Sequence, residues 1–169
     1  NHRGAKGTEF LIRSVESLQA EGLQVELVLM EKVPNDQVRE TMQTVDILAD
    51  QFIATAYALS AIEGMASGLP VMSNLEHETY TRVCRRYAFL NECPILSTTP
   101  ENLTQNLRVL VTDPKFREEL GKAGRQYVEK YHSYEMAQYL FGSIYEKILG
   151  GREVDLMSLF HPLTSEFNR

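Results

Sequence analysis

Two short stretches of this sequence carry side chains whose types and spacing suit the binding of a phosphorylated ligand. Lys6 is flanked by nearby glycines just ahead of a run with helical periodicity, so its ammonium group and the bare backbone could both contact an anion. Ser60 opens a short predicted helix after an apolar strand, which places free backbone N–H groups and a positive dipole end at the strand's carboxyl edge. Glu63 lies one turn further along, where a carboxylate can accept hydrogen bonds from vicinal hydroxyls such as those of a ribose. Together the three residues predict a nucleotide site.

Each of these residues also has an ordinary structural interpretation. Lys6 could be a solvated lysine at the start of a helix, and Glu63 could be an exposed helical glutamate. Ser60 could be a plain helix N-cap, although a cap uses one amide and leaves others for a ligand. Residue types alone leave both interpretations open.

Two motifs in this chain resemble those of a known enzyme family. The first is the run Ile62-Glu63-Gly64-Met65-Ala66-Ser67-Gly68-Leu69-Pro70-Val71, and the second is Asn1-His2-Arg3-Gly4-Ala5-Lys6-Gly7-Thr8. They resemble the donor-binding motif and the lysine–glycine loop of the retaining GT-B glycosyltransferases of group 1 (glycosyltransferase family 4). The likeness extends from the first residue to about Gly150.

The resemblance implies a role for each matching residue. In this family the lysine of the loop, here Lys6, binds the donor diphosphate, and the backbone at Leu59 and Ser60 holds the same group. The second glutamate of the family motif corresponds to Glu63 and binds the donor ribose. Lys6 and Glu63 are therefore the expected catalytic residues.

The sequence departs from the family pattern at two positions of the expected donor site. Thr55 stands where the family has its first glutamate, which contacts the transferred sugar, and Ala58 stands where a glycine is expected. Threonine can still donate a hydrogen bond to a hydroxyl but carries no charge, and the methyl of Ala58 limits how closely the backbone approaches a phosphate. These differences concern the sugar end of the site more than the nucleotide end.

Alternating helix and strand patterns predict an α/β fold with a doubly wound, Rossmann-like parallel sheet flanked by helices. Helices are expected over 8–21, 34–44, 60–67, 76–90, 100–111, 114–131 and 133–149, and strands over 24–30, 46–53, 70–73 and 94–98. Such a domain normally opens with a strand, so we expect its first strand to be lacking here. Residues 1–150 are expected to form the nucleotide-sugar-binding domain, and 151–169 a carboxyl-terminal tail.

Composition excludes several other classes of protein. The chain has 169 residues, 43% of them hydrophobic and 24% charged, with a net charge of −6, which disfavours a general nucleic-acid surface. It contains no apolar run of membrane-spanning length, and its two cysteines have no metal-type spacing, which favours a reduced, cytoplasmic pair. No metal and no cofactor are expected, since the family works without a bound metal.

The expected function is that of the donor-binding domain of a retaining glycosyltransferase of the hexosyltransferase type. The intact enzyme would transfer a sugar from a nucleotide diphosphate sugar to a saccharide or lipid-linked acceptor. An amino-terminal domain would bind the acceptor, so the isolated chain should bind donor without turnover. A degenerate GT-B-like domain with a structural or partner-binding role is the main alternative, and a nucleotide-sugar epimerase is a third. The base, sugar, acceptor and oligomeric state stay open.

Overall fold

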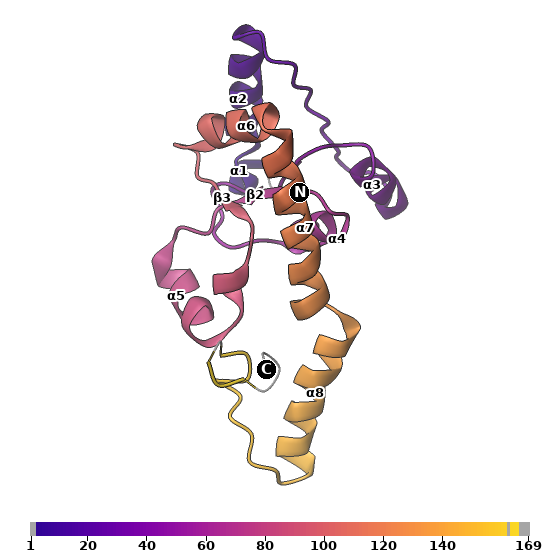
Figure 1. Ribbon diagram of the computed structural model, residues 1–169, viewed down its shortest axis with the longest axis vertical. Helices are drawn as coiled ribbons and strands as arrows, with labels where there is room; N and C mark the ends of the chain where they lie inside the picture. Colours follow the sequence, from indigo (N-terminus) through magenta and orange to yellow (C-terminus); the bar gives the residue numbers. More distant parts are fainter. Residues whose placement is uncertain (1–2, 162, 166–169) are drawn as a thin grey trace.

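Three short strands form a parallel sheet in their order along the chain, with helices on both sides of it (Figure 1). The computed structural model describes residues 3–161 and 163–165. The strands are β1 (Leu48–Ala49), β2 (Val71–Ser73) and β3 (Leu96–Ser97). The helices are α1 (Arg3–Lys6), α2 (Thr8–Ala20), α3 (Asn35–Met42), α4 (Leu59–Ala66), α5 (Glu78–Tyr87), α6 (Leu103–Thr112), α7 (Pro114–Tyr131) and α8 (Tyr134–Leu149), with a 3-10 turn at Leu90–Glu92.

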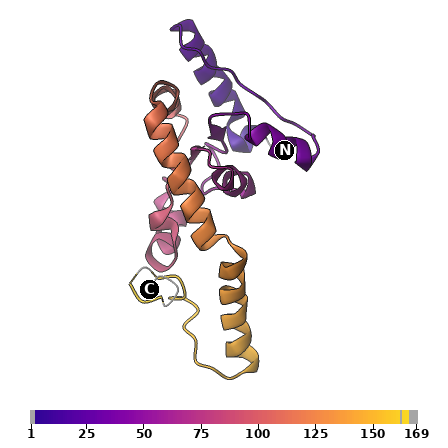
Figure 2. The same ribbon diagram turned by 45° about the vertical axis from the view of Figure 1, so that its right-hand side comes forward.

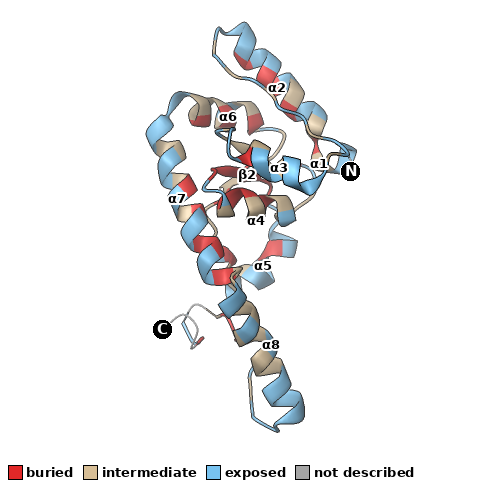
Figure 3. Cartoon of the chain, turned by 90° about the vertical axis from the view of Figure 1, so that its right-hand side faces the viewer, coloured by how far each residue is buried: buried red, intermediate tan, exposed pale blue. Residues whose placement is uncertain are grey.

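The core consists of two apolar clusters that meet at the central strand, β2. Val71 belongs to one cluster and its neighbour Met72 to the other, because successive side chains of a strand point to opposite faces of the sheet. The first cluster contains buried residues of α4 and α7, and the second contains buried residues of α2 and α6. Figure 3 shows the buried residues concentrated in this part of the chain. The expected α/β class and parallel pairing are therefore confirmed, in a sheet with both faces covered.

One predicted strand is wrong. Residues 24–30 connect α2 to α3 as an extended trace (Figure 1) and belong to no helix or sheet. A strand pattern specifies a pleated, half-buried surface, whereas a ladder also needs a neighbouring backbone at hydrogen-bonding distance. The structure also replaces the expected loop around Lys6 by the single turn of α1, and shortens the predicted strand 46–53 to β1.

The longest helices lie close to where the sequence predicts them. α7 begins with Pro114 after Asp113, whose carboxylate accepts a hydrogen bond from the Phe116 amide at 2.9 Å. α8 begins after Ser133, whose hydroxyl accepts from the Met136 amide at 3.2 Å. Both predicted boundaries, 114–131 and 133–149, are confirmed to within a residue.

The carboxyl-terminal helix extends away from the sheet, and the tail returns beside it (Figure 2). No residue of α8 is buried. The tail packs through Leu159 and Phe160, which are both buried, and the Phe160 ring lies 5.6 Å from that of Phe89 and 5.8 Å from that of Tyr139. Residues 162 and 166–169 of the expected tail lie outside the described residues.

Two further expectations concern the side chains and helices that the structure describes. Cys84 and Cys93 are both free thiols. Within 3–161 and 163–165, no helix combines the length and the apolar character needed to cross a membrane.

α7 crosses the turn before β2 at a point where only glycine fits. A Cβ atom added to Gly121 would lie 2.1 Å from the carbonyl oxygen of Gly68, which belongs to the backbone and cannot swing aside. The sheet and α7 can therefore reach their observed packing only with hydrogen at this position.

We predict that Gly121→Ala lowers the free energy of unfolding by about 2 kcal/mol, because α7 must move away from the turn. Gly142→Ala in α8 is the matched control, since nothing lies within 4 Å of its added methyl. That variant should be neutral or stabilised by about 0.5 kcal/mol, as expected for alanine in a helix. Urea unfolding of the two variants measures the difference, and equal stabilities would contradict the described packing.

Candidate functional site

The candidate site lies at the carboxyl edge of the sheet, where the loop 50–58 leaves β1 and enters α4. α1 docks on this loop through two backbone hydrogen bonds, from the Phe52 amide to the Lys6 carbonyl and from the Ala54 amide to the Ala5 carbonyl, both 2.9 Å. Gly7 then turns the chain into α2 with a φ of 74°, in the left-handed region. The docking fixes where the Lys6 side chain begins.

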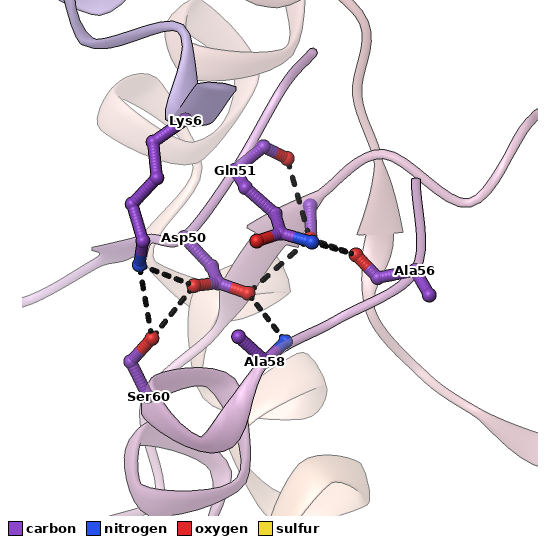
Figure 4. Close-up of polar contacts among 7 residues, drawn as sticks. Lys6, Asp50, Gln51, Ala56, Ala58 and Ser60 are labelled. Atoms are coloured by element: carbon purple, nitrogen blue, oxygen red, sulfur yellow. Dashed lines mark hydrogen bonds and ion pairs between the residues drawn. The ribbon is translucent and has the colours of Figure 1, made fainter. Parts of the chain in front are cut away.

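Lys6, Asp50 and Ser60 form a closed triangle of polar contacts (Figure 4). The Lys6 ammonium donates to Asp50 Oδ1 at 3.1 Å and to Ser60 Oγ at 3.3 Å, and the Ser60 hydroxyl donates to the same carboxylate oxygen at 2.7 Å. The predicted phosphate-binding lysine and the predicted helix start thus lie together, although 54 residues separate them in the chain.

The second carboxylate oxygen of Asp50 accepts a hydrogen bond from the backbone at the start of α4. Asp50 Oδ2 accepts from the Ala58 amide at 2.9 Å and from the Ser73 hydroxyl at 3.4 Å. The Asp50 side chain is fully buried, and its donors come from three elements, namely α1, the start of α4 and β2. The interpretation of Ser60 as an N-cap is wrong, because the cap position is Ala58 and the hydroxyl of Ser60 serves Asp50 instead.

The loop between Asp50 and α4 is held in one conformation by its backbone. The Ala56 amide donates to the Asn74 carbonyl at 2.8 Å, and the Ala56 carbonyl accepts from Gln51 Nε2 at 2.7 Å and from the Ser73 hydroxyl at 3.1 Å. Ala56 has a φ of 75°, which is costly for a residue with a side chain and is typical of functional loops. Ala58, in contrast, is extended with a φ of −100°, so its methyl strains nothing.

Two backbone donors at the amino end of α4 have no acceptor among the described residues. The Ala58 amide is taken by Asp50, and the amides of Ala61 and Ile62 turn back to the Ala58 carbonyl. The amides of Leu59 and Ser60 form no such bond within 3–161 and 163–165. They are the donors that a ligand anion could use.

The remaining predicted site residues surround this point less closely. Glu63 is partly exposed and lies on the Ser60 side of α4, three residues further along, and its carboxylate has no partner in the described part of the chain. Thr55 is partly exposed in the loop 50–58. Leu59 is 69% exposed, so the tip of α4 is open to solvent. The structure therefore brings Lys6 to Ser60, and places Glu63 beside them without a direct contact.

A charged pair and a cavity adjoin the triangle. Arg3 forms an ion pair with Glu31 at 2.8 Å, and both residues are roughly half exposed. These two side chains and the triangle line one end of a cavity of about 590 Å³ that extends between residues 24–31 and β1.

The electrostatic field at the tip of α4 differs from the sequence-based expectation, in which the charge of Lys6 is available to an anion. Because Asp50 pairs with Lys6, the two formal charges cancel, and the positive field comes mainly from the helix dipole and the free amides. The Lys6 ammonium keeps some freedom, since its side chain is 35% exposed and it has a third N–H beyond the two in use.

Asp50 is the functional residue that the sequence reasoning missed. Its signal is a lone acidic residue directly after the apolar run that becomes β1, a position where a buried carboxylate needs several donors to be tolerated. The donors come from residues far apart in the chain, so their convergence is visible only in three dimensions.

A buried aromatic network ties the loop to α7. The Tyr57 hydroxyl lies 2.8 Å from that of Tyr127 and 3.0 Å from His132 Nε2. Burial raises the pKa of both phenols well above their usual range, lowers the pKa of His132 and raises the pKa of the nearby Cys93 thiol. These groups are neutral near pH 7, and their contacts link Tyr57 in the loop 50–58 to the end of α7.

The described residues contain no cluster of three or more histidine, cysteine, aspartate or glutamate side chains placed to hold a metal ion. The triangle offers one carboxylate, already surrounded by donors, which is a poor start for a cation site.

We predict that the chain loses stability as pH falls below about 6.5. Burial lowers the pKa of folded His132, so the unfolded chain, with its ordinary value of 6.5, binds the proton more readily. The stabilising contribution is complete above 6.5 and is lost as pH falls toward the lower folded pKa. Urea unfolding between pH 7.5 and pH 5, with His132→Gln as the non-titrating control, measures this. Identical pH profiles for the two proteins would exclude His132 as the cause.

We also predict that Asp50→Ala lowers the free energy of unfolding by about 2 kcal/mol or more, because the Ala58 amide and the Ser60 hydroxyl lose their acceptor and Lys6 loses its counter-charge. Asp46→Ala is the control, since Asp46 is an exposed acidic residue just before the same strand and should change stability by less than about 0.5 kcal/mol. Thermal unfolding compares the two variants. A loss confined to Asp46→Ala would contradict the described role of Asp50.

Comparison of this chain with protein-family models, with curated proteins and with solved structures found no match in any of the three. The functional interpretation therefore depends on the residues and geometry described above.

Proposed function

We propose that this chain binds the diphosphate of a nucleotide diphosphate sugar at the amino end of α4, as the donor-binding domain of a retaining GT-B glycosyltransferase. The observation that carries the proposal is the position of the Lys6 ammonium, 3.3 Å from Ser60 Oγ and beside the free amides of Leu59 and Ser60. A lysine, two backbone donors and a positive helix end converge there, which is the set of groups that binds a diphosphate.

The bound diphosphate would accept from the Leu59 and Ser60 amides and from the third N–H of Lys6. As the bond between sugar and diphosphate breaks, negative charge grows on the departing phosphate, and donors already in place stabilise that charge. Asp50 contributes by holding Lys6 against Ser60, so that the ammonium needs little reorientation. Lys6 is thus the expected catalytic residue, and Asp50 positions it.

Glu63 would bind the ribose hydroxyls and thereby fix the position of the anomeric carbon. Its carboxylate has no partner among the described residues, and it lies one helical turn from the proposed phosphate position. Thr55, in the loop 50–58, would face the transferred sugar with a neutral hydroxyl.

In this proposal the domain is doubly wound and needs no metal, and the acceptor groups come from a separate amino-terminal domain. The intact enzyme transfers a hexosyl group to a saccharide or lipid-linked acceptor. The 169-residue chain alone binds the donor and does not turn it over.

One observation favours a second candidate, a GT-B-like domain with a structural or partner-binding role. Asp50 already neutralises Lys6 and accepts from the Ala58 amide, so two of the groups that could bind an anion have a partner without a ligand. Thr55 also lacks the charge that the family glutamate provides at the sugar end.

Titration of the 169-residue chain with UDP, GDP and ADP, followed by amide NMR shifts, separates the two candidates. We expect one nucleotide to shift the Gly7, Leu59 and Ser60 amides, and Lys6→Met to weaken its binding by about ten-fold, or about 1.4 kcal/mol. Lys115→Met is the control, because Lys115 is 85% exposed at the start of α7. Absence of shifts with every nucleotide at millimolar concentration would favour the structural role.

A further inference from the structure

The segment 24–31 has the side-chain pattern of a strand but no ladder. Its residues alternate between partly buried and exposed up to Val28, and Val25 and Leu27 pack against the second core cluster. Among the described residues, its backbone makes one hydrogen bond, from Gln19 Nε2 to the Val25 carbonyl. Val28 and Leu29 remain 49% and 41% exposed. An extended backbone with free donors and acceptors is a template for strand pairing.

The outer edge of β1 is also unpaired. The Leu48 amide donates to the Pro70 carbonyl and the Asp50 amide to the Met72 carbonyl, both at 3.0 Å, so these alternate residues face β2. The backbone groups of Ile47 and Ala49 therefore point to the opposite edge. No backbone partner for them occurs in the part of the chain that the structure describes.

These two free edges line the same cavity. Its volume is about 590 Å³, and its walls include residues 24–31 on one side and 44–50 on the other. Apolar side chains of three helices complete the lining, namely Leu11 and Val15 of α2, Val38 and Met42 of α3, and Leu107 and Val111 of α6. The cavity therefore combines two rows of backbone donors and acceptors with an aliphatic lining.

We propose that this cavity binds one extended polypeptide strand that pairs with residues 24–31 on one side and with Ile47 and Ala49 on the other. Rows of alternating N–H and C=O groups on both walls match the two edges of a strand, whereas a compact small molecule could satisfy only a few of them. The strand runs parallel to β1, as β2 and β3 do. It would convert two separate extended elements into one continuous sheet.

The chemistry of the occupant follows from the lining. A strand in this position has helices over both faces, so its side chains are aliphatic on both faces, rich in valine and isoleucine and free of charge. About five or six residues match the usual length of a strand. Its carboxyl end lies near Lys6 and Ser60, because these residues line the cavity at the carboxyl edge of the sheet.

The test uses a capped synthetic hexapeptide of valine and isoleucine with flanking lysines, added to the 169-residue chain. Hydrogen exchange should slow at least ten-fold for amides in 24–31 and for Ala49, and binding should saturate. The matched peptide with alternate N-methylated residues has the same side chains but lacks the ladder donors. It should protect none of these amides and bind at least ten-fold more weakly.

A protein variant provides a second control. Val28→Asp places a charge in the cavity at an exposed position, and it should weaken peptide binding at least ten-fold while the chain stays folded. Val83→Asp changes a similarly exposed valine, 55% exposed, in α5, and it should bind like the unchanged chain.

Three results would overturn the proposal. One is equal binding of the methylated peptide, which would make the cavity a general apolar pocket. Another is no protection with either peptide. The third is protection that grows with protein concentration in the absence of peptide, which would make a second copy the occupant. Failure of nucleotide binding would leave these readouts unchanged, because they report on amides other than Gly7, Leu59 and Ser60.

Discussion

A single buried carboxylate organises the carboxyl edge of this sheet. Asp50 can stay ionised inside the protein only if donors surround it, and they come from α1, the start of α4 and the end of β2. Satisfying Asp50 therefore sets the position of Lys6 relative to Ser60. The arrangement of the candidate phosphate site therefore follows from the burial of one carboxylate together with its hydrogen-bond donors.

The same arrangement explains why donor binding and a purely structural role are close competitors. Asp50 holds the lysine in place and also cancels its charge, so the tip of α4 is well ordered but only weakly positive. A diphosphate binds only if its hydrogen bonds with Lys6 and with the two free amides are more favourable than those that these groups form with water. Binding then depends on how far the partly exposed ammonium can share its donors between Asp50 and a ligand.

Much of this could be predicted from the sequence, because local patterns set local structure. The periodicity of residues 114–131 and the caps Asp113 and Ser133 fix two helices closely. The role of Asp50 could not be read in this way, since its donors are up to 44 residues away. The prediction of a strand over 24–30 was wrong for a related reason. Its pattern describes the side chains of a strand, but a strand also needs a neighbouring strand to pair with.

The junction between α7 and α8 has a bearing on the site through His132. This residue ends α7, its ring lies 3.0 Å from the Tyr57 hydroxyl, and Tyr57 directly precedes Ala58 at the start of α4. α8 has no buried residues of its own, so its orientation depends on the turn at His132 and Ser133 and on the tail. The His132–Tyr57 contact is thus a shared anchor, because one imidazole both closes α7 ahead of α8 and fixes the residue that leads into α4.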